Sequence, residues 1–143
     1  SRTALFAATG AVLSLALLHS TINSTIQGTN EPIEHKRAGL WLKNYDDSNP
    51  VVMSRKPWVS FYSGGTWICL PFGTYEEIID YAYRNEVKYL VIDEMYVTKV
   101  RPQLEFLLDE KMAPGGLKPV YRDRSSGRAL LIYRLSDRPA ETS

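Results

Sequence analysis

The chain has 143 residues, 44% of them hydrophobic and 23% charged, which is the composition of a globular protein and excludes a disordered one. Its 17 basic and 16 acidic residues leave a net charge of +1, which excludes the basic excess that nucleic-acid-binding proteins show. A single cysteine, Cys69, excludes an internal disulfide and a cysteine-based metal site, and we expect it to be a buried apolar residue.

An uncharged apolar run, Ala4–Leu18, comes first in the chain, and no Asp, Glu, Lys or Arg occurs between Thr3 and Asn30. As a helix, its fifteen residues would span about 22 Å, compared with roughly 30 Å for the hydrocarbon core of a bilayer. We interpret residues 1–30 as the end of a transmembrane helix and its connector. Two alternatives stay open, a secretory signal peptide that begins with Arg2 and a buried helix of a soluble domain.

The charges around this run predict its orientation. Arg2 precedes the run, and the first charged residues after it are acidic, Glu31 and Glu34. The positive-inside rule then places the start of the chain in the cytoplasm and the main domain on the extracytoplasmic side of the membrane. A glycosylation sequon at Asn23 is compatible with that location.

The remainder of the chain alternates between helical and strand patterns. Apolar residues at helical spacing predict helices near residues 32–45, 58–62, 75–82 and 102–111. The third of these begins with a capping box, in which Thr74 is the N-cap and Glu77 reaches back to it. Apolar runs between turn residues predict strands near residues 51–54, 66–71, 88–93, 117–123 and 128–135.

Strands that alternate with helices are typical of α/β folds. We therefore expect a three-layer helix–sheet–helix sandwich over residues 31–136, with a mostly parallel sheet of about five strands and an antiparallel edge hairpin. The expected strand order is 2-1-3-4-5. An apolar N-terminal helix would precede this domain, and residues 137–143 would form a polar tail.

Five segments in this order resemble one protein family. They are AGLWLKNY, VVMSRKPWVSFYSGG, LPFGTYEEIIDYAYRNEVKYLVIDE, RPQLEFLL and LLIYRL, and together they cover most of residues 34–135. They resemble the C-terminal extramembrane domain of family 39-type glycosyltransferases. These polytopic membrane enzymes are related to dolichyl-phosphate-mannose protein mannosyltransferases and to the lipid-A aminoarabinose transferase.

The resemblance implies a role as one part of a larger transferase. Members of the family transfer a sugar from a polyprenyl-phosphate carrier to an acceptor outside the cytoplasm, and their catalytic acidic residue lies in an early extramembrane loop. The catalytic residues would then lie outside this chain, and we expect no catalysis from the domain alone. Its implied partners are the membrane domain of the same polypeptide, the lipid bilayer, and a lipid-linked sugar or acceptor, with no nucleic acid and no cofactor.

The sequence offers little support for a catalytic site within this chain. There is no nucleotide-binding glycine motif and no His-Glu-x-x-His metal motif. We expect His35 to be an exposed helix residue and no metal site to form. Asp93 and Glu94 resemble a catalytic acidic pair, but carboxylates at the end of a buried strand more often cap the following helix. The sequence around Gly64 and Gly65 is interpreted as a plain turn rather than a phosphate-binding loop.

The best candidate for a contact surface follows the first strand, because open parallel sheets bind ligands beyond the carboxyl ends of their strands. Arg55 and Lys56 would contact phosphate there, and Trp58 or Tyr62 would stack on a sugar or lie at the level of lipid headgroups. The simpler interpretation, which we favour, places Trp58 and Tyr62 in the core together with Phe61. For Arg101 we expect either a helix-start role or an ion pair with a nearby carboxylate.

Three hypotheses of function follow. In the first, the chain carries the accessory extracytoplasmic domain of a membrane glycosyltransferase that uses lipid-linked sugars. In the second, it is a single-pass membrane-anchored α/β binding module with no transferase role. A third hypothesis, a soluble enzyme of flavodoxin-like architecture, is disfavoured because the sequence has no phosphate-binding loop.

Overall fold

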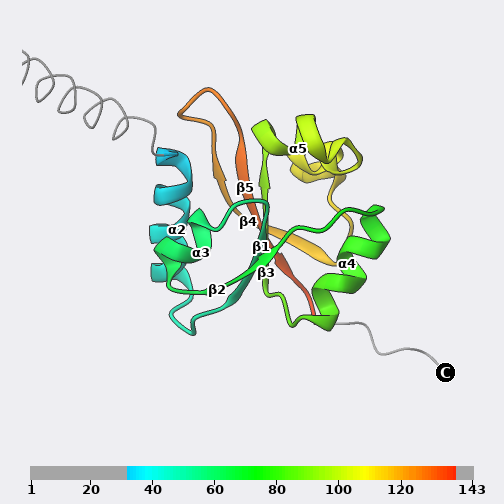
Figure 1. The fold of residues 1–143 in the computed structure, drawn as a ribbon. Coiled ribbons are helices and arrows are strands. Elements are labelled where there is room, and N and C mark those ends of the chain that lie inside the picture. The colour runs from blue at the N-terminus through cyan, green and yellow to red at the C-terminus, as the bar shows by residue number, and fades with distance from the viewer. Residues whose placement is uncertain (1–31, 138–143) are drawn as a thin grey trace, which may run out of the picture. The chain divides into compact units, whose positions relative to one another are not determined.

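The computed structural model describes residues 32–137, and the apolar run predicted to be a membrane helix lies outside them. Within the described part, an α/β domain is built on a five-stranded mixed sheet in the order β2-β1-β3-β5-β4 (Figure 1). The strands are β1 (Val51–Ser54), β2 (Thr66–Cys69), β3 (Tyr89–Asp93), β4 (Leu117–Asp123) and β5 (Leu130–Leu135). No helix among residues 32–137 is long and apolar enough to cross a membrane.

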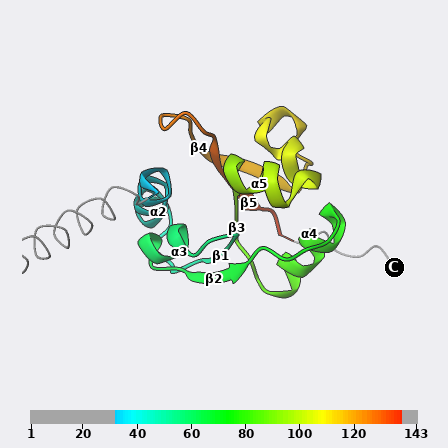
Figure 2. The same ribbon diagram turned by 45° about the horizontal axis from the view of Figure 1, so that its top comes forward.

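Helices cover both faces of the sheet. One face is covered by α2 (Ile33–Tyr45) and α3 (Trp58–Ser63), and the other by α4 (Tyr75–Arg84), α5 (Glu94–Val100) and the 3₁₀ helix η1 (Pro102–Leu108) (Figures 1 and 2). A short 3₁₀ helix, η2 (Glu110–Met112), follows η1. The domain is therefore of the α/β class, as the alternation of patterns predicts.

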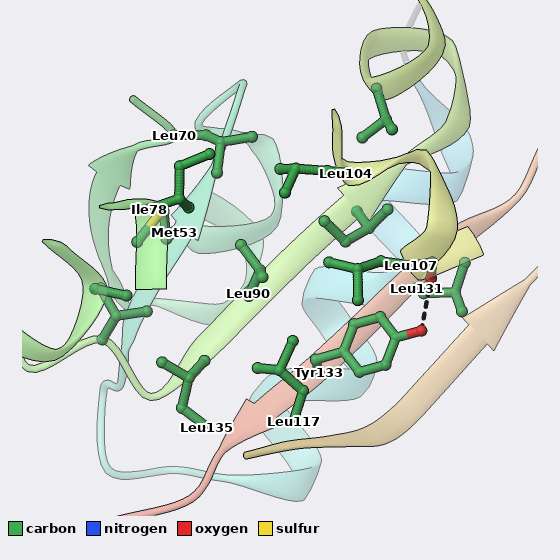
Figure 3. Packing of buried hydrophobic residues seen from close by; sticks show 14 of the residues in the cluster. Met53, Leu70, Ile78, Leu90, Leu104, Leu107, Leu117, Leu131, Tyr133 and Leu135 are labelled. Atoms are coloured by element: carbon green, nitrogen blue, oxygen red, sulfur yellow. Dashed lines mark hydrogen bonds between the residues drawn. The ribbon is translucent and has the colours of Figure 1, made fainter. Parts of the chain in front are cut away.

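The alternation of side chains along the strands gives the domain two cores, one on each face of the sheet. In β1, Val52 packs in the core under α2 and α3, whereas its neighbour Met53 packs in the core under α4 and η1. In the second core, the buried hydroxyl of Tyr133 donates a hydrogen bond to the carbonyl of Leu107 at 2.6 Å (Figure 3). This bond satisfies a polar group that would otherwise be costly to bury.

The order of the last two strands differs from the predicted 2-1-3-4-5. β5 lies between β3 and β4 and is antiparallel to both, so the sheet is mixed rather than fully parallel, and its antiparallel strand lies beside the edge strand β4. The difference has a physical reason. β5 is buried on both faces except at Arg134, whereas β4 is half-exposed and contains Pro119, which lacks an N–H group for a second neighbouring strand. β4 therefore occupies the edge.

The crossovers create a switch point between β1 and β3. The connection from β1 to β2 runs through α3 on one face, and the connection from β2 to β3 runs through α4 on the other face (Figure 1). Both β2 and β3 pair with β1 in parallel. In open sheets of this kind, ligands bind in the crevice outside the carboxyl ends of the strands at the switch point.

Local sequence chemistry explains where several helices begin. The predicted capping box is confirmed, because Thr74 accepts a hydrogen bond from the Glu77 amide and the Glu77 carboxylate accepts one from the Thr74 amide. The helix predicted at 102–111 is instead the 3₁₀ helix η1, although Leu104 and Leu107 are buried as expected. α5, for which no helical pattern was identified in the sequence, begins where the Asp93 carboxylate accepts a hydrogen bond from the Met95 amide.

Candidate functional site

A small cleft lies at the switch point, at the carboxyl ends of β1 and β3. We call it the carboxyl-end cleft, and its enclosed space of about 10 Å³ is enough for one water molecule. It is lined by His35, Ser54, Arg55, Lys56, Leu70, Val91, Asp93, Tyr96, Val97 and Arg101. The structure therefore brings together three of the five predicted contact residues, namely Arg55, Lys56 and Arg101.

A buried pair, His35 and Asp93, forms the inner wall of this cleft. The His35 Nε2 atom lies 2.7 Å from Asp93 Oδ2, and the two side chains are 3% and 9% exposed. The second Asp93 oxygen accepts the hydrogen bond from the Met95 amide that caps α5. The other imidazole nitrogen, Nδ1, has no hydrogen-bond partner among residues 32–137, and its nearest carboxylate is that of Glu34, at 3.7 Å.

The prediction that His35 is exposed is therefore wrong. His35 lies on the buried stripe of α2 with Ala38, Gly39 and Leu42, because these residues are three, four and seven positions further along the helix. Burial of the imidazole is offset by its contact with the Asp93 carboxylate, an ion pair whenever the imidazole is protonated. Extending the apolar stripe of α2 by one turn toward its N-terminus would have identified this position.

Arg101 is the most firmly held cation in the cleft. Its guanidinium donates to the carbonyls of Pro71 at 2.8 Å, Val100 at 2.7 Å and Leu70 at 3.2 Å, and the residue is only 2% exposed. Burial, and then the charge of Arg55, lower the pKa of Arg101. The predicted ion pair between Arg101 and a carboxylate does not form, because backbone carbonyls take up its donors. The residue joins the end of β2 to the end of α5.

Arg55 and Lys56 are the available cations of the cleft. Both are half-buried, and neither forms an ion pair with a carboxylate among the described residues. The Lys56 Nζ atom lies 5.9 Å from the centroid of the Tyr96 ring. Burial, and then the charge of Asp93, raise the pKa of the Tyr96 hydroxyl, and the charge of Arg55 opposes that rise.

The charges that line the cleft are unbalanced. Arg55, Lys56 and Arg101 face one carboxylate, that of Asp93, which gives a formal charge of +2 when the His35 imidazole is neutral. Charge of one sign in a cleft with apolar walls concentrates ions of the opposite sign. The arrangement therefore attracts an anionic group such as a phosphate to the mouth of the cleft, because its enclosed space holds only about one water molecule. Arg binds phosphate in a bidentate manner and Lys as a point charge.

The two aromatic candidates, Trp58 and Tyr62, do not line the cleft, and the prediction that they lie in the core together with Phe61 is wrong, because none of the three belongs to either hydrophobic core. Trp58 is 41% exposed and Phe61 is 72% exposed, whereas Tyr62 is half-buried. α3 instead buries Val59 and the small residues Ser60 and Ser63. Each serine hydroxyl donates to a backbone carbonyl three residues earlier, which satisfies it inside the domain.

Two other sequence interpretations can be compared with the structure. Cys69 is exposed on the edge strand β2, so the expectation that it is buried is wrong. The sequence around Gly64 forms a turn, as expected, in which the Gly64 amide bonds to the carbonyls of Phe61 and Ser60. No group of three or more His, Cys, Asp or Glu side chains among residues 32–137 is placed to hold a metal ion.

Comparisons with known proteins add no identification. No protein-family model, no curated protein and no solved structure matches this chain.

Proposed function

We propose that residues 31–136 form the extracytoplasmic accessory domain of a polytopic membrane glycosyltransferase, which transfers a sugar from a polyprenyl-phosphate carrier to an acceptor. In this proposal the catalytic residues lie in another part of the polypeptide. The domain contributes a cationic cleft rather than a complete active site. The resemblance of the five sequence segments to family 39-type transferases suggests the class, and the apolar run Ala4–Leu18 suggests the attachment to a membrane.

The observation that carries the proposal is the position of the carboxyl-end cleft relative to the entry of the chain into the domain. His35 belongs to the first turn of α2, and it contacts Asp93 at the end of β3. The chain therefore enters the domain at the end that holds Arg55 and Lys56. An anionic lipid-linked substrate is presented at a membrane surface, and cations at the end of the domain where the chain enters it support the proposal.

Two measurements test the proposal. The first is retention of the chain in membranes after extraction with alkaline carbonate, which removes peripheral proteins. The second is sugar transfer from a polyprenyl-phosphate carrier by membranes that contain the intact protein. We expect retention in the first and transfer in the second.

Each outcome has a distinct meaning. Release of the chain by carbonate would contradict attachment through the apolar run. Retention without sugar transfer by the intact protein would contradict the transferase role, and it would favour a single-pass membrane-anchored α/β binding module.

A further inference from the structure

Exposed aromatic residues occur at the carboxyl ends of β1 and β2, the end of the sheet that holds the carboxyl-end cleft. Phe72 is 82% exposed, Trp58 is 41% exposed and Trp67 is 40% exposed, although all three are large apolar residues. Trp58 follows Arg55 and Lys56 in the segment after β1, Trp67 belongs to β2, and Phe72 lies in the segment after β2. We define the aromatic–basic rim as five residues, namely Arg55, Lys56, Trp58, Trp67 and Phe72.

Contacts with the ends of the strands hold the rim in place. The indole N–H of Trp67 donates to the Ser54 carbonyl at 3.1 Å, which fixes Trp67 beside the carboxyl end of β1. The guanidinium carbon of Arg101 lies 3.5 Å from the centroid of the Phe72 ring. Because three backbone carbonyls fix Arg101, the Phe72 ring rests on a rigid support and stays exposed.

We propose that the aromatic–basic rim rests on the surface of an anionic lipid bilayer. Tryptophan and other aromatic side chains are favoured at the level of lipid headgroups, and Lys and Arg beside them are attracted to anionic lipids. Trp58 and Phe72 are the aromatic residues of the rim, and Arg55 and Lys56 are its basic residues. Neither basic residue forms an ion pair with a carboxylate among residues 32–137. The inference rests on the proposed membrane attachment.

The length of chain before the domain supports a lipid surface as the occupant. Residues 19–32 separate the apolar run from α2, and fourteen residues span at most about 50 Å when fully extended. The first turn of α2 contacts the end of β3, so the described chain begins at the end of the sheet that carries the rim. A surface that is both aromatic and basic is complementary to an anionic bilayer.

Tryptophan quenching by lipids with brominated acyl chains tests this inference directly. The chain of 143 residues is reconstituted into vesicles of phosphatidylglycerol and brominated phosphatidylcholine. One variant, W41F/W67F, keeps Trp58 in the rim, and a second, W58F/W67F, keeps Trp41. Trp41 is the matched control, because it belongs to the last turns of α2, away from the rim, and stacks on Tyr45 of the same helix with ring centroids 4.6 Å apart.

We expect Trp58 to be quenched several-fold more strongly than Trp41. R55E/K56E should reduce the quenching of Trp58 to the level of Trp41, while the chain stays bound to the vesicles through its apolar run. If W67F disturbs folding, as circular dichroism would show, the difference in quenching between the unmodified chain and W58F supplies the same comparison.

Equal quenching of Trp58 and Trp41 in a chain that alkaline carbonate does not remove would overturn the inference and leave the proposed function intact. Release of the chain by carbonate would instead count against the proposed function. Quenching of Trp58 that is unchanged in R55E/K56E would overturn the role of the anionic headgroups.

Discussion

The two ends of the sheet bury similar polar groups in different ways. At the amino end, the Asp46 carboxylate forms an ion pair with Lys88 Nζ at 2.6 Å. It also accepts hydrogen bonds from the Tyr89 hydroxyl at 2.8 Å and the Ser48 hydroxyl at 2.6 Å. At the carboxyl end, Asp93 contacts His35, whose second nitrogen has no hydrogen-bond partner among residues 32–137.

The amino end is therefore a structural network, whereas the carboxyl end is a candidate binding site. Burial acts to raise the pKa of Asp46, but the hydrogen bonds from Lys88, Ser48 and Tyr89 outweigh it and hold that pKa far below its ordinary value. Burial and the Asp46 carboxylate hold the pKa of Tyr89 far above its ordinary value. The amino end is thus satisfied internally, whereas the carboxyl end keeps cations available for a ligand.

The largest effect is expected for Arg101, the cleft cation that backbone carbonyls hold. Arg101→Ala should lower the free energy of unfolding by about 3 kcal/mol, because it leaves buried carbonyls without a charged donor. Urea unfolding in detergent micelles measures this, and Arg101→Lys should recover part of the loss. A loss no larger than that of Arg55→Ala would contradict the structural role of Arg101.

Removal of the acid at the amino end should have the next largest effect. Asp46→Ala should lower the free energy of unfolding by about 2 kcal/mol, because the buried Tyr89 hydroxyl loses its acceptor and Lys88 loses its ion pair. The exposed neighbour Asp47 is the control, and Asp47→Ala should change stability by less than about 0.5 kcal/mol. Equal effects at the two positions would show that the network is not stabilising.

The pH dependence of stability should report the same carboxylate. Since the pKa of Asp46 is lower in the folded state than in the unfolded state, Asp46 contributes stability above its unfolded pKa, and that stability is lost as the pH falls toward the folded value. Between pH 5 and pH 3 the chain should lose about 1 kcal/mol more than Asp46→Asn does. Urea unfolding at the two pH values measures this, and parallel losses would contradict the assignment.

The smallest effect on stability is expected for the available cations. Arg55→Ala and Lys56→Ala should each change the free energy of unfolding by less than about 0.5 kcal/mol, since neither side chain has an ion pair to lose among the described residues. Their effect should fall on ligand binding instead. A loss of unfolding free energy near that of Arg101→Ala would show that Arg55 and Lys56 stabilise the fold rather than being available for a ligand.

Sequence patterns predicted the strands better than they predicted the site. The apolar run before Asp93 indicated a strand buried on both faces, and β3 is fully buried. The predicted order of β4 and β5 was wrong, because strand order depends on which strand can occupy the edge of the sheet. Pro119 in β4 and the apolar residues of β5 indicate that β4 is the edge strand, and the predicted order did not take them into account.

The sequence predicted only part of the candidate site. Arg55 and Lys56 follow a parallel strand, so the general position of ligands in open sheets identified them. The burial of His35 follows from the apolar stripe of α2, but its contact with Asp93 joins residues far apart in the chain, and no local pattern indicates that partner. Arg101 was predicted as a contact residue, but its bonds to the carbonyls at the end of β2 are equally remote in sequence. The exposure of Trp58 was missed because Ser60 and Ser63, rather than aromatic residues, form the buried face of α3.

The central claim is that the carboxyl end of the sheet acts in sugar transfer at a membrane, and a charge-matched comparison tests it most directly. Sugar transfer from a polyprenyl-phosphate carrier is measured in membranes that contain the intact protein, either as R55A/K56A or as K43A/K118A, which removes two exposed lysines near the amino end. The account predicts that R55A/K56A loses most of the transfer rate and that K43A/K118A keeps it. Equal rates in the two variants, both correctly folded, would contradict the account.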